Sequence, residues 1–168
     1  MNLRIRTLDE RADRAGFGCG SDPLDAWFHR QAGQSQRKRL ASVWIATTGA
    51  EPRVVVGYYS LAPWQVAFEQ APPELTRRLP KYPLAATLLA RLAIDRRWQG
   101  QGMGGVLLAD ALRRAYAASK IIPMQLLVVH AKDENAAAFY AKHGLRPFPK
   151  APLHLFLPMA SIAEAGTD

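Results

Sequence analysis

Apolar and polar positions change their spacing near the middle of the chain, and this change predicts its central elements. Residues Thr87–Ile94 are apolar almost throughout, which is typical of a strand buried on both faces. From Met103 the apolar residues take a helical spacing, with Asp110 expected on the polar face. Glycine recurs at Gly100 and Gly102 between these two segments. The pattern therefore predicts a strand, a glycine-rich turn and an amphipathic helix.

The residues before this centre predict a strand, a helical region and a hairpin. Leu3–Leu8 alternates apolar and charged residues, as an edge strand does, and Asp9 is expected to cap a short helix. Pro23 lies where a second helix would begin, because proline is tolerated in the first turn. The two runs Ser42–Thr48 and Arg53–Leu61 are expected to pair as a hairpin.

Prolines are expected to limit the regular elements on both sides of the centre. Pro63 begins a proline-rich loop with at most a short helix near Glu74–Leu79. Pro147 and Pro149 are expected to end the region before a last strand, Leu153–Leu157.

The chain after the central helix repeats the alternation of strand and helix. Met124–Val129 reads as a strand, Asp133 as the cap of a helix that carries Tyr140, and Gly144 as the residue after its end. The order β-α-α-β-β-β-α-β-α-β predicts an α/β (α+β) fold. We expect one domain over residues 1–168, with a mixed central sheet of about six to seven strands and helices on both faces.

Composition excludes several classes of protein. The chain has 168 residues and no apolar run long enough to span a membrane, and its first residues do not resemble a signal segment. Its single cysteine, Cys19, cannot form an intrachain disulfide, and its four histidines lack metal-site spacing. These features indicate a cytoplasmic protein without a metal.

Charge is the informative part of the composition. Twenty-two Lys and Arg residues against fourteen Asp and Glu give a net charge of +8 and a pI near 10.1. Such a balance suits nucleic acid, an anionic cofactor or a solvated surface. Much of the positive charge is clustered, at Arg37-Lys38-Arg39, Arg77-Arg78, Arg96-Arg97 and Arg113-Arg114.

The glycine-rich turn is a candidate phosphate site. A helix N-terminus presents free N–H groups and the positive end of the helix dipole, and glycine lets the backbone approach a ligand. No Gly-Lys-Ser/Thr follows, so the Walker pattern fails, and no acidic residue ends a strand about 20 residues on, as the dinucleotide fingerprint requires. The sequence Gln99-x-x-Gly102-x-Gly104 instead resembles the signature of the GNAT superfamily of acetyl-CoA-dependent N-acetyltransferases.

The resemblance implies acetyl-CoA as cofactor and assigns residues to it. The last strand residues before the turn would contact the pantetheine, and the turn would hold the pyrophosphate. A second motif, from Asn135 to Tyr140 and Gly144-Leu145, matches the family's pattern approximately. It implies a cofactor contact for Asn135 and a general acid in Tyr140. The cofactor-binding candidates are Leu92, Ala93, Ile94, Gln99, Gly100, Gln101, Gly102, Met103, Gly104, Gly105 and Asn135.

Further motifs narrow the resemblance to one branch of the superfamily. Phe17-x-Cys19-Gly20, Val56–Leu61, Leu89–Asp95 and His130–Asp133 are similar to the GNAT toxins of type II toxin–antitoxin modules. Those toxins acetylate the α-amine of aminoacyl-tRNA and so block translation. The resemblance implies a homodimer and a ribbon–helix–helix antitoxin. Candidate tRNA contacts are Arg37, Lys38, Arg77, Arg78, Arg96 and Arg97.

The chemistry of such a transfer fits the residues present. An α-amino group has a pKa of about 7.7–8.0, so a fraction of the amine is already neutral at physiological pH. A lysine side chain has a pKa of about 10.4 and needs a general base. No acidic residue stands out at the strand ends, while the Tyr140 hydroxyl can protonate the leaving thiolate. Three functions stay open: a tRNA-directed toxin, an N-acetyltransferase for small-molecule or protein amines, and a non-catalytic binding protein. His130 as a proton relay and Trp98 as a stacking residue also stay open.

Overall fold

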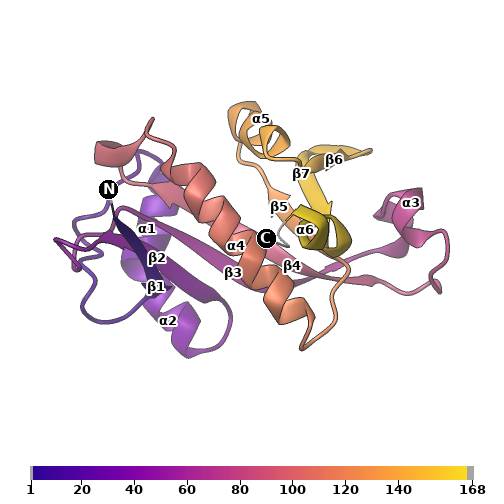
Figure 1. Cartoon of the computed structure of the whole chain (residues 1–168), viewed down its shortest axis with the longest axis horizontal. Coiled ribbons are helices and arrows are strands. Elements are labelled where there is room, and N and C mark those ends of the chain that lie inside the picture. Colours follow the sequence, from indigo (N-terminus) through magenta and orange to yellow (C-terminus); the bar gives the residue numbers. More distant parts are fainter. Residues whose placement is uncertain (1, 166–168) are drawn as a thin grey trace. The chain divides into compact units, whose positions relative to one another are not determined.

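Seven strands form one mixed sheet in the computed structural model, which describes residues 2–165 (Figure 1). The strand order is β1-β2-β3-β4-β5-β7-β6, with β4 and β5 parallel. The elements are β1 Leu3–Thr7, α1 Asp22–Arg30, α2 Ala32–Arg37, β2 Ser42–Thr48, β3 Gly57–Val66, the 3-10 turn η1 Phe68–Gln70, α3 Pro73–Thr76, β4 Leu84–Ile94, the 3-10 turn η2 Arg96–Trp98, α4 Met103–Ser119, β5 Leu126–His130, α5 Glu134–Lys142, β6 Arg146–Phe148, β7 Ala151–Pro158 and α6 Met159–Ala165. The predicted mixed α/β sheet of six to seven strands is confirmed.

The chain divides into two compact units. The first comprises the chain up to Ala62 together with Ala90–Ala111, and the second comprises Pro63–Leu89 together with the chain from Leu112 onward. Three elements, β3, β4 and α4, pass from one unit to the other. Within residues 2–165 there is no helix of the length and apolarity that a membrane crossing requires.

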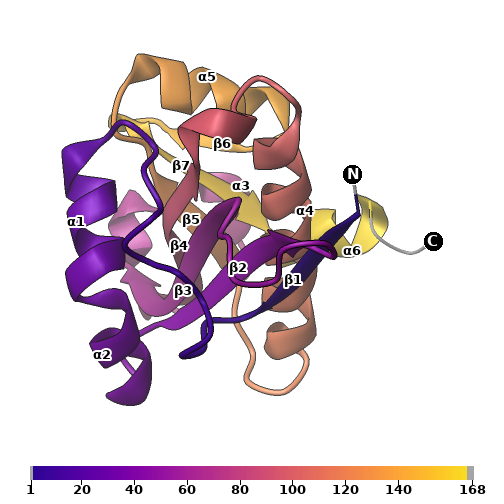
Figure 2. The same ribbon diagram turned by 90° about the vertical axis from the view of Figure 1, so that its left-hand side faces the viewer.

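In the first unit, helices pack on opposite sides of the strands. Figure 2 shows α1 and α2 on one side of β1–β3 and α4 on the other. The Tyr58 ring stacks on Phe28 at 4.3 Å between centroids, on the α1 side. Neighbouring strand residues face opposite ways, so Tyr59 points toward α4 and its hydroxyl donates to Asp110 Oδ2 at 2.5 Å. The prediction that Asp110 lies on the polar, solvent-exposed face of the helix is wrong, because Asp110 is only 7% exposed.

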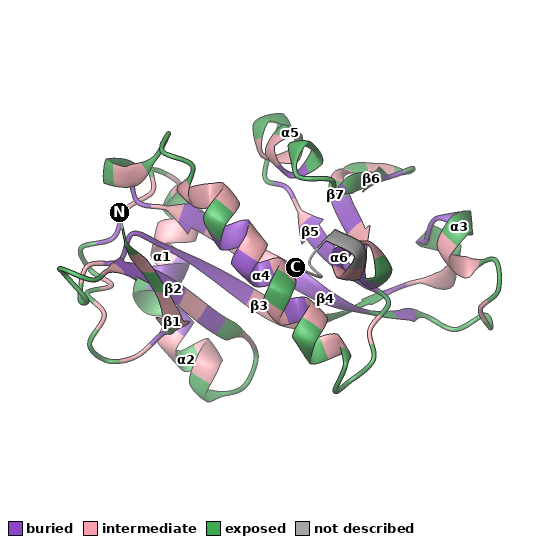
Figure 3. Cartoon of the chain, in the orientation of Figure 1, coloured by how far each residue is buried: buried purple, intermediate pink, exposed green. Residues whose placement is uncertain are grey.

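In the second unit, buried strands form the core. Val128 on β5 lies opposite Leu88 on β4 and Phe156 on β7. β5 is buried along most of its length, whereas β7 is buried mainly in its second half (Figure 3). The predicted limits of α5 are confirmed. The Asp133 carboxylate accepts from the Ala136 N–H at 2.8 Å, and Gly144 has the left-handed φ of 95° that ends a helix.

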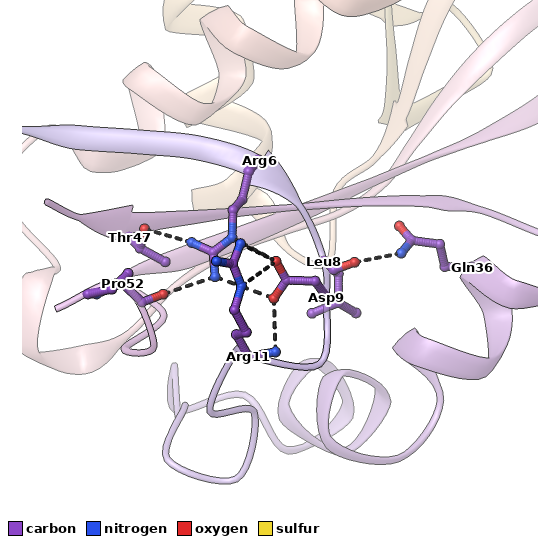
Figure 4. A network of polar contacts seen from close by, with 7 residues as sticks. All are labelled: Arg6, Leu8, Asp9, Arg11, Gln36, Thr47 and Pro52. Carbon is purple, nitrogen blue, oxygen red and sulfur yellow. Dashed lines mark hydrogen bonds and ion pairs between the residues drawn. The ribbon is translucent and has the colours of Figure 1, made fainter.

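The predicted helix after Asp9 is absent from the described residues, because the Asp9 carboxylate binds arginines instead of capping a helix. It accepts from Arg6 Nε at 3.1 Å and from Arg11 Nη2 at 3.0 Å (Figure 4). The same Arg6 guanidinium also donates to Thr47 Oγ1 at 3.0 Å, which ties the end of β1 to β2. The hydrogen bond from the Arg6 guanidinium lowers the pKa of Asp9 to about 2.

Two prolines that we expected to limit the regular elements lie inside strands instead, and β6 was not predicted. β3 starts later than predicted, at Gly57, and continues through Pro63 to Val66. Pro147 belongs to β6, which is the last strand of the sheet, where a missing N–H donor is tolerated. The last long strand is Ala151–Pro158, and α6 after it was not predicted.

Candidate active site

The glycine-rich turn joins β4 to α4 and has the backbone of a phosphate cradle. Gly100 and Gly102 have φ values of 76° and 82°, which side chains disfavour. The Gly102 carbonyl accepts from the Val106 N–H at 3.3 Å, so Gly102 is the residue that directly precedes α4 and accepts its first hydrogen bond. The N–H groups of its first turn have no partner inside the helix and point toward its N-terminal end. A Cβ at Gly100 or Gly102 would meet no atom within 4 Å, so there is space for a ligand. The residues present therefore fit a pyrophosphate.

A buried carboxylate fixes the start of this turn. Asp95 is 3% exposed and accepts from the N–H of Arg97 at 2.9 Å, from Arg97 Nε at 2.9 Å and from the N–H of Gly18 at 3.0 Å. Burial alone would raise the pKa of this carboxyl, but the hydrogen bonds from Arg97 and Gly18 hold the pKa below its usual value. The charged Asp95 thus ties the turn to the loop that precedes α1.

Gln99 makes a second connection to the same loop. Its side-chain amide Nε2 lies 2.8 Å from the carbonyl oxygens of both Cys19 and Ile94. Both are acceptors, so the amide donates to them and holds the turn against the end of β4. Arg96 adds a third link, because its N–H donates to the Gly18 carbonyl at 2.9 Å. Sequence patterns alone did not reveal these links.

The strand residues that we assigned to pantetheine lie against a glycine on β3. An ideal Cβ at Gly57 would lie 2.7 Å from Ile94 Cδ1, 2.9 Å from the Ala93 carbonyl oxygen and 3.0 Å from Leu107 Cδ2. Only glycine allows this close approach of β3, β4 and α4. Ala93 is buried, whereas Leu92 and Ile94 are half-buried.

Tyr140 and Asn135 belong to the second unit, on α5. Tyr140 is 8% exposed, and burial raises the pKa of its hydroxyl to about 12. The hydroxyl therefore keeps its proton at neutral pH, as a proton donor must. Asn135 is exposed in the first turn of the helix.

The basic candidates divide into two groups. Arg37 and Lys38 at the end of α2, and Arg77 and Arg78 after α3, are exposed. Arg97 instead pairs with Asp95, and its guanidinium carbon lies 4.7 Å from the centroid of the Trp98 ring. Arg96 and Arg97 are exposed too, so the two groups differ in the ion pair of Arg97 with Asp95 rather than in exposure.

Histidine contacts in the second unit were not predicted. His130 at the end of β5 stacks on His154 of β7 with 3.9 Å between ring centroids, and Trp64 contacts His130 edge-on at 5.2 Å. Their separation in sequence concealed this contact. Across residues 2–165, no group of three or more His, Cys, Asp or Glu side chains could hold a metal ion.

Known proteins are similar to this chain in both sequence and fold. Residues 39–147 match the acetyltransferase (GNAT) domain family. The chain belongs to the GNAT acetyltransferase family. It is accordingly an acetyl-CoA-dependent acetyltransferase, and the assignment of the turn from Gln99 to Gly105 to the cofactor pyrophosphate stays a prediction.

Individual relatives cover nearly the whole chain. A tRNA-acetylating toxin of Mycobacterium tuberculosis is 34% identical over 154 residues, which cover 92% of this chain and 90% of the relative. The solved structure of AtaT complexed with acetyl-methionyl-tRNAfMet is 29% identical, with a TM-score of 0.90 and coverage of 98% and 99%. A tyrosine-to-phenylalanine variant of AtaT, bound to the C-terminus of the antitoxin AtaR and to acetyl-CoA, is 28% identical, with a TM-score of 0.84 and full coverage of both chains.

Proposed function

We propose that this GNAT enzyme is a toxin that transfers the acetyl group of acetyl-CoA to the α-amino group of aminoacyl-tRNA and so blocks translation. The observation that carries the proposal is the similarity, over nearly the full chain, to AtaT bound to acetyl-methionyl-tRNAfMet. The identity of 34% to a tRNA-acetylating toxin over 92% of the chain supports it.

Binding of the cofactor is assigned to the β4–α4 segment. Acetyl-CoA supplies the acetyl group as a thioester. Leu92, Ala93 and Ile94 contact its pantetheine arm, while the N–H groups from Gln99 to Gly105 bind its pyrophosphate. The Gln99 side chain keeps the turn in place through its bonds to Cys19 and Ile94. Asn135 adds a polar contact from α5.

Tyr140 is the proposed general acid. As the amine attacks the thioester carbonyl, the carbon–sulfur bond breaks and the sulfur takes a proton from the Tyr140 hydroxyl. The proton that the amine loses restores the hydroxyl, so no net charge accumulates on the buried side chain. Burial raises the pKa of this hydroxyl to about 12, so the phenol is protonated at neutral pH and can donate its proton.

An α-amine explains why the site needs no strong base. A free α-amino group has a pKa of about 7.7–8.0, and esterification of the neighbouring carboxyl lowers this value further. Enough neutral amine is therefore present at physiological pH.

The basic charge, the partners and the location follow from the same proposal. The exposed pairs Arg37-Lys38 and Arg77-Arg78 bind tRNA phosphates, with Arg96 and Arg97 as further candidates near the turn. Residues 1–168 form one catalytic domain that assembles as a homodimer in the cytoplasm. A ribbon–helix–helix antitoxin neutralises it, a partner supported by the AtaR complexes of AtaT.

The test is acetyl transfer from labelled acetyl-CoA to charged tRNA, with deacylated tRNA and free amino acids as controls. Label that appears only on charged tRNA, and that mild base releases together with the amino acid, supports the proposal. Absence of label on charged tRNA, with acetyl-CoA still bound, would instead favour an N-acetyltransferase for small-molecule or protein amines.

A further inference from the structure

A cavity in the second unit lies outside the turn and outside Tyr140. It has a volume of about 520 Å³ and is bounded by the end of β3, the η1–α3 segment, β5 and the β6–β7 hairpin. Sites for small ligands usually measure about 300–1,000 Å³. The volume of the cavity is therefore sufficient for a small ligand or a large side chain.

Aromatic rings and imidazoles form one wall of this cavity. His130 and His154 lie opposite each other in the β5–β7 register and stack at 3.9 Å with 24° between ring planes. Trp64 contacts His130 at 79° between planes and is 43% exposed, so much of its ring faces solvent rather than the core. Val128 and Phe148 add buried apolar surface. Such a wall suits flat or apolar groups.

The electrostatics of the cavity disfavour a charged ligand. Burial, and secondarily the neighbouring His154, lower the pKa of His130, so its imidazole is neutral at physiological pH. Among the described residues that line the cavity, Lys150 is the one with a fixed positive charge, and the exposed Glu69 offsets it. A phosphate-bearing nucleotide would find little compensation for its charge here.

The place of the cavity in the chain connects it to the reaction. His130 is the last residue of β5, and only residues 131–133 separate it from α5, which carries Tyr140. Ligands of α/β sheets commonly bind beyond the carboxyl ends of strands. In an aminoacyl-tRNA, the side chain and the acetylated amine share one carbon atom.

We infer that this cavity receives the side chain of the amino acid carried by the tRNA and selects large uncharged side chains, aromatic or aliphatic. The inference rests on the proposed function and adds its substrate class. Trp64, His130 and His154 are the residues that determine the selection.

The experiment compares acetylation of phenylalanyl-, methionyl-, glycyl-, lysyl- and aspartyl-tRNA by the wild type and by Trp64→Ala. We expect kcat/KM of the wild type to be highest for phenylalanyl- and methionyl-tRNA. Trp64→Ala should lower these two values about tenfold or more, the range for lost apolar contacts in a specificity pocket, while glycyl-tRNA changes less than about twofold. Tyr82→Ala is the matched control, because Tyr82 is an exposed aromatic of the same unit that does not line the cavity. An equal loss for every substrate, or no change in the order of preference, would overturn the inference.

A measurement without tRNA separates this inference from the proposed function. N-acetylphenylalanine amide and N-acetylglycine amide are titrated into the protein while the imidazole NMR signals of His130 and His154 are followed. His154→Gln assigns the signals and should weaken binding of the phenylalanine derivative. Shifts caused by the phenylalanine derivative alone support the pocket even if no charged tRNA is acetylated, and equal or absent shifts count against it.

Discussion

The side-chain nitrogen of Gln99 lies 2.8 Å from the backbone carbonyl oxygen of Cys19, 80 positions earlier in the sequence. A second contact of 2.8 Å joins the same nitrogen to the Ile94 carbonyl. The side chain of Gln99 thus holds the turn in place, and the backbone N–H groups of the turn are left for the proposed contact with the cofactor.

Replacing Gln99 should therefore weaken cofactor binding more than the chemical step. We expect Gln99→Ala to raise KM for acetyl-CoA several-fold and to leave kcat within about twofold, because uniform binding is lost. Steady-state kinetics with acetyl-CoA and with acetyl-pantetheine, which lacks the pyrophosphate, measure this. Gln101→Ala is the control, since that side chain makes only a 3.4 Å contact to Arg97. Equal effects on the two acetyl donors would contradict the positioning role.

Tyr140→Phe should fold and bind acetyl-CoA but lose most turnover. The phenyl ring keeps the buried apolar contacts of a residue that is 8% exposed and removes only the hydroxyl. General acid catalysis contributes about 10²–10⁴-fold, so kcat should fall by about that factor. Calorimetric titration with acetyl-CoA checks binding, and acetyl transfer checks turnover. Unchanged turnover would remove Tyr140 from the mechanism.

Gly57→Ala should destabilise the first unit. The added methyl would meet the Ala93 carbonyl oxygen at 2.9 Å, and backbone cannot rotate away as a side chain can. Overpacking of this kind costs about 1–3 kcal/mol in free energy of unfolding, measurable by urea denaturation. Gly49→Ala is the matched control, because its nearest neighbour would be Asn2 Nδ2 at 3.7 Å. Equal stability of the two variants would argue against the close approach.

Charge reversal at Arg77 and Arg78 should weaken tRNA binding without affecting the cofactor. Both residues are exposed, so Arg77→Glu with Arg78→Glu removes phosphate contacts and leaves the fold intact. The affinity for charged tRNA should fall, and its logarithm should depend less steeply on the logarithm of salt concentration. Filter binding at several salt concentrations provides the slope. A slope equal to that of the wild type would exclude these residues from the tRNA surface.

The stability contributed by Asp9 should depend on pH. Its folded pKa of about 2 lies below the ordinary value of 3.8, so the carboxylate stabilises the fold above pH 3.8 and loses this effect as pH falls to about 2. Asp9→Asn should cost about 1 kcal/mol or less at pH 7, because the side chain is 32% exposed. Urea unfolding of both proteins from pH 7 to pH 2.5 measures the difference. A difference that does not shrink in acid would refute the ion pairs.

Local signals in the sequence sufficed where the interacting groups are close in the chain. Asp133 and Gly144 delimit α5 through contacts within a few residues. Gly100 and Gly102 have positive φ values, which their residue type alone predicts. Helix capping and φ preferences depend on the residue types at neighbouring positions, so the sequence predicts these features directly.

Contacts between distant residues set the features that the sequence did not reveal. Asp110 occupies a position that helical periodicity assigns to solvent, yet Tyr59, 51 residues away, satisfies its carboxylate inside the core. The cavity wall joins Trp64, His130 and His154 from three strands. Periodicity describes one element at a time, so it cannot predict which polar groups meet after the strands pair.

The passage of β3, β4 and α4 between the two compact units constrains how proteins of this kind can be divided. Because the chain passes from one unit to the other three times, no single cut yields two fragments that each contain one whole unit. Exchange of one unit between relatives would need three junctions, each inside a strand or a helix. Chimaeric enzymes made by one crossover should therefore combine parts of both units, and their success would depend on matched packing along these three elements.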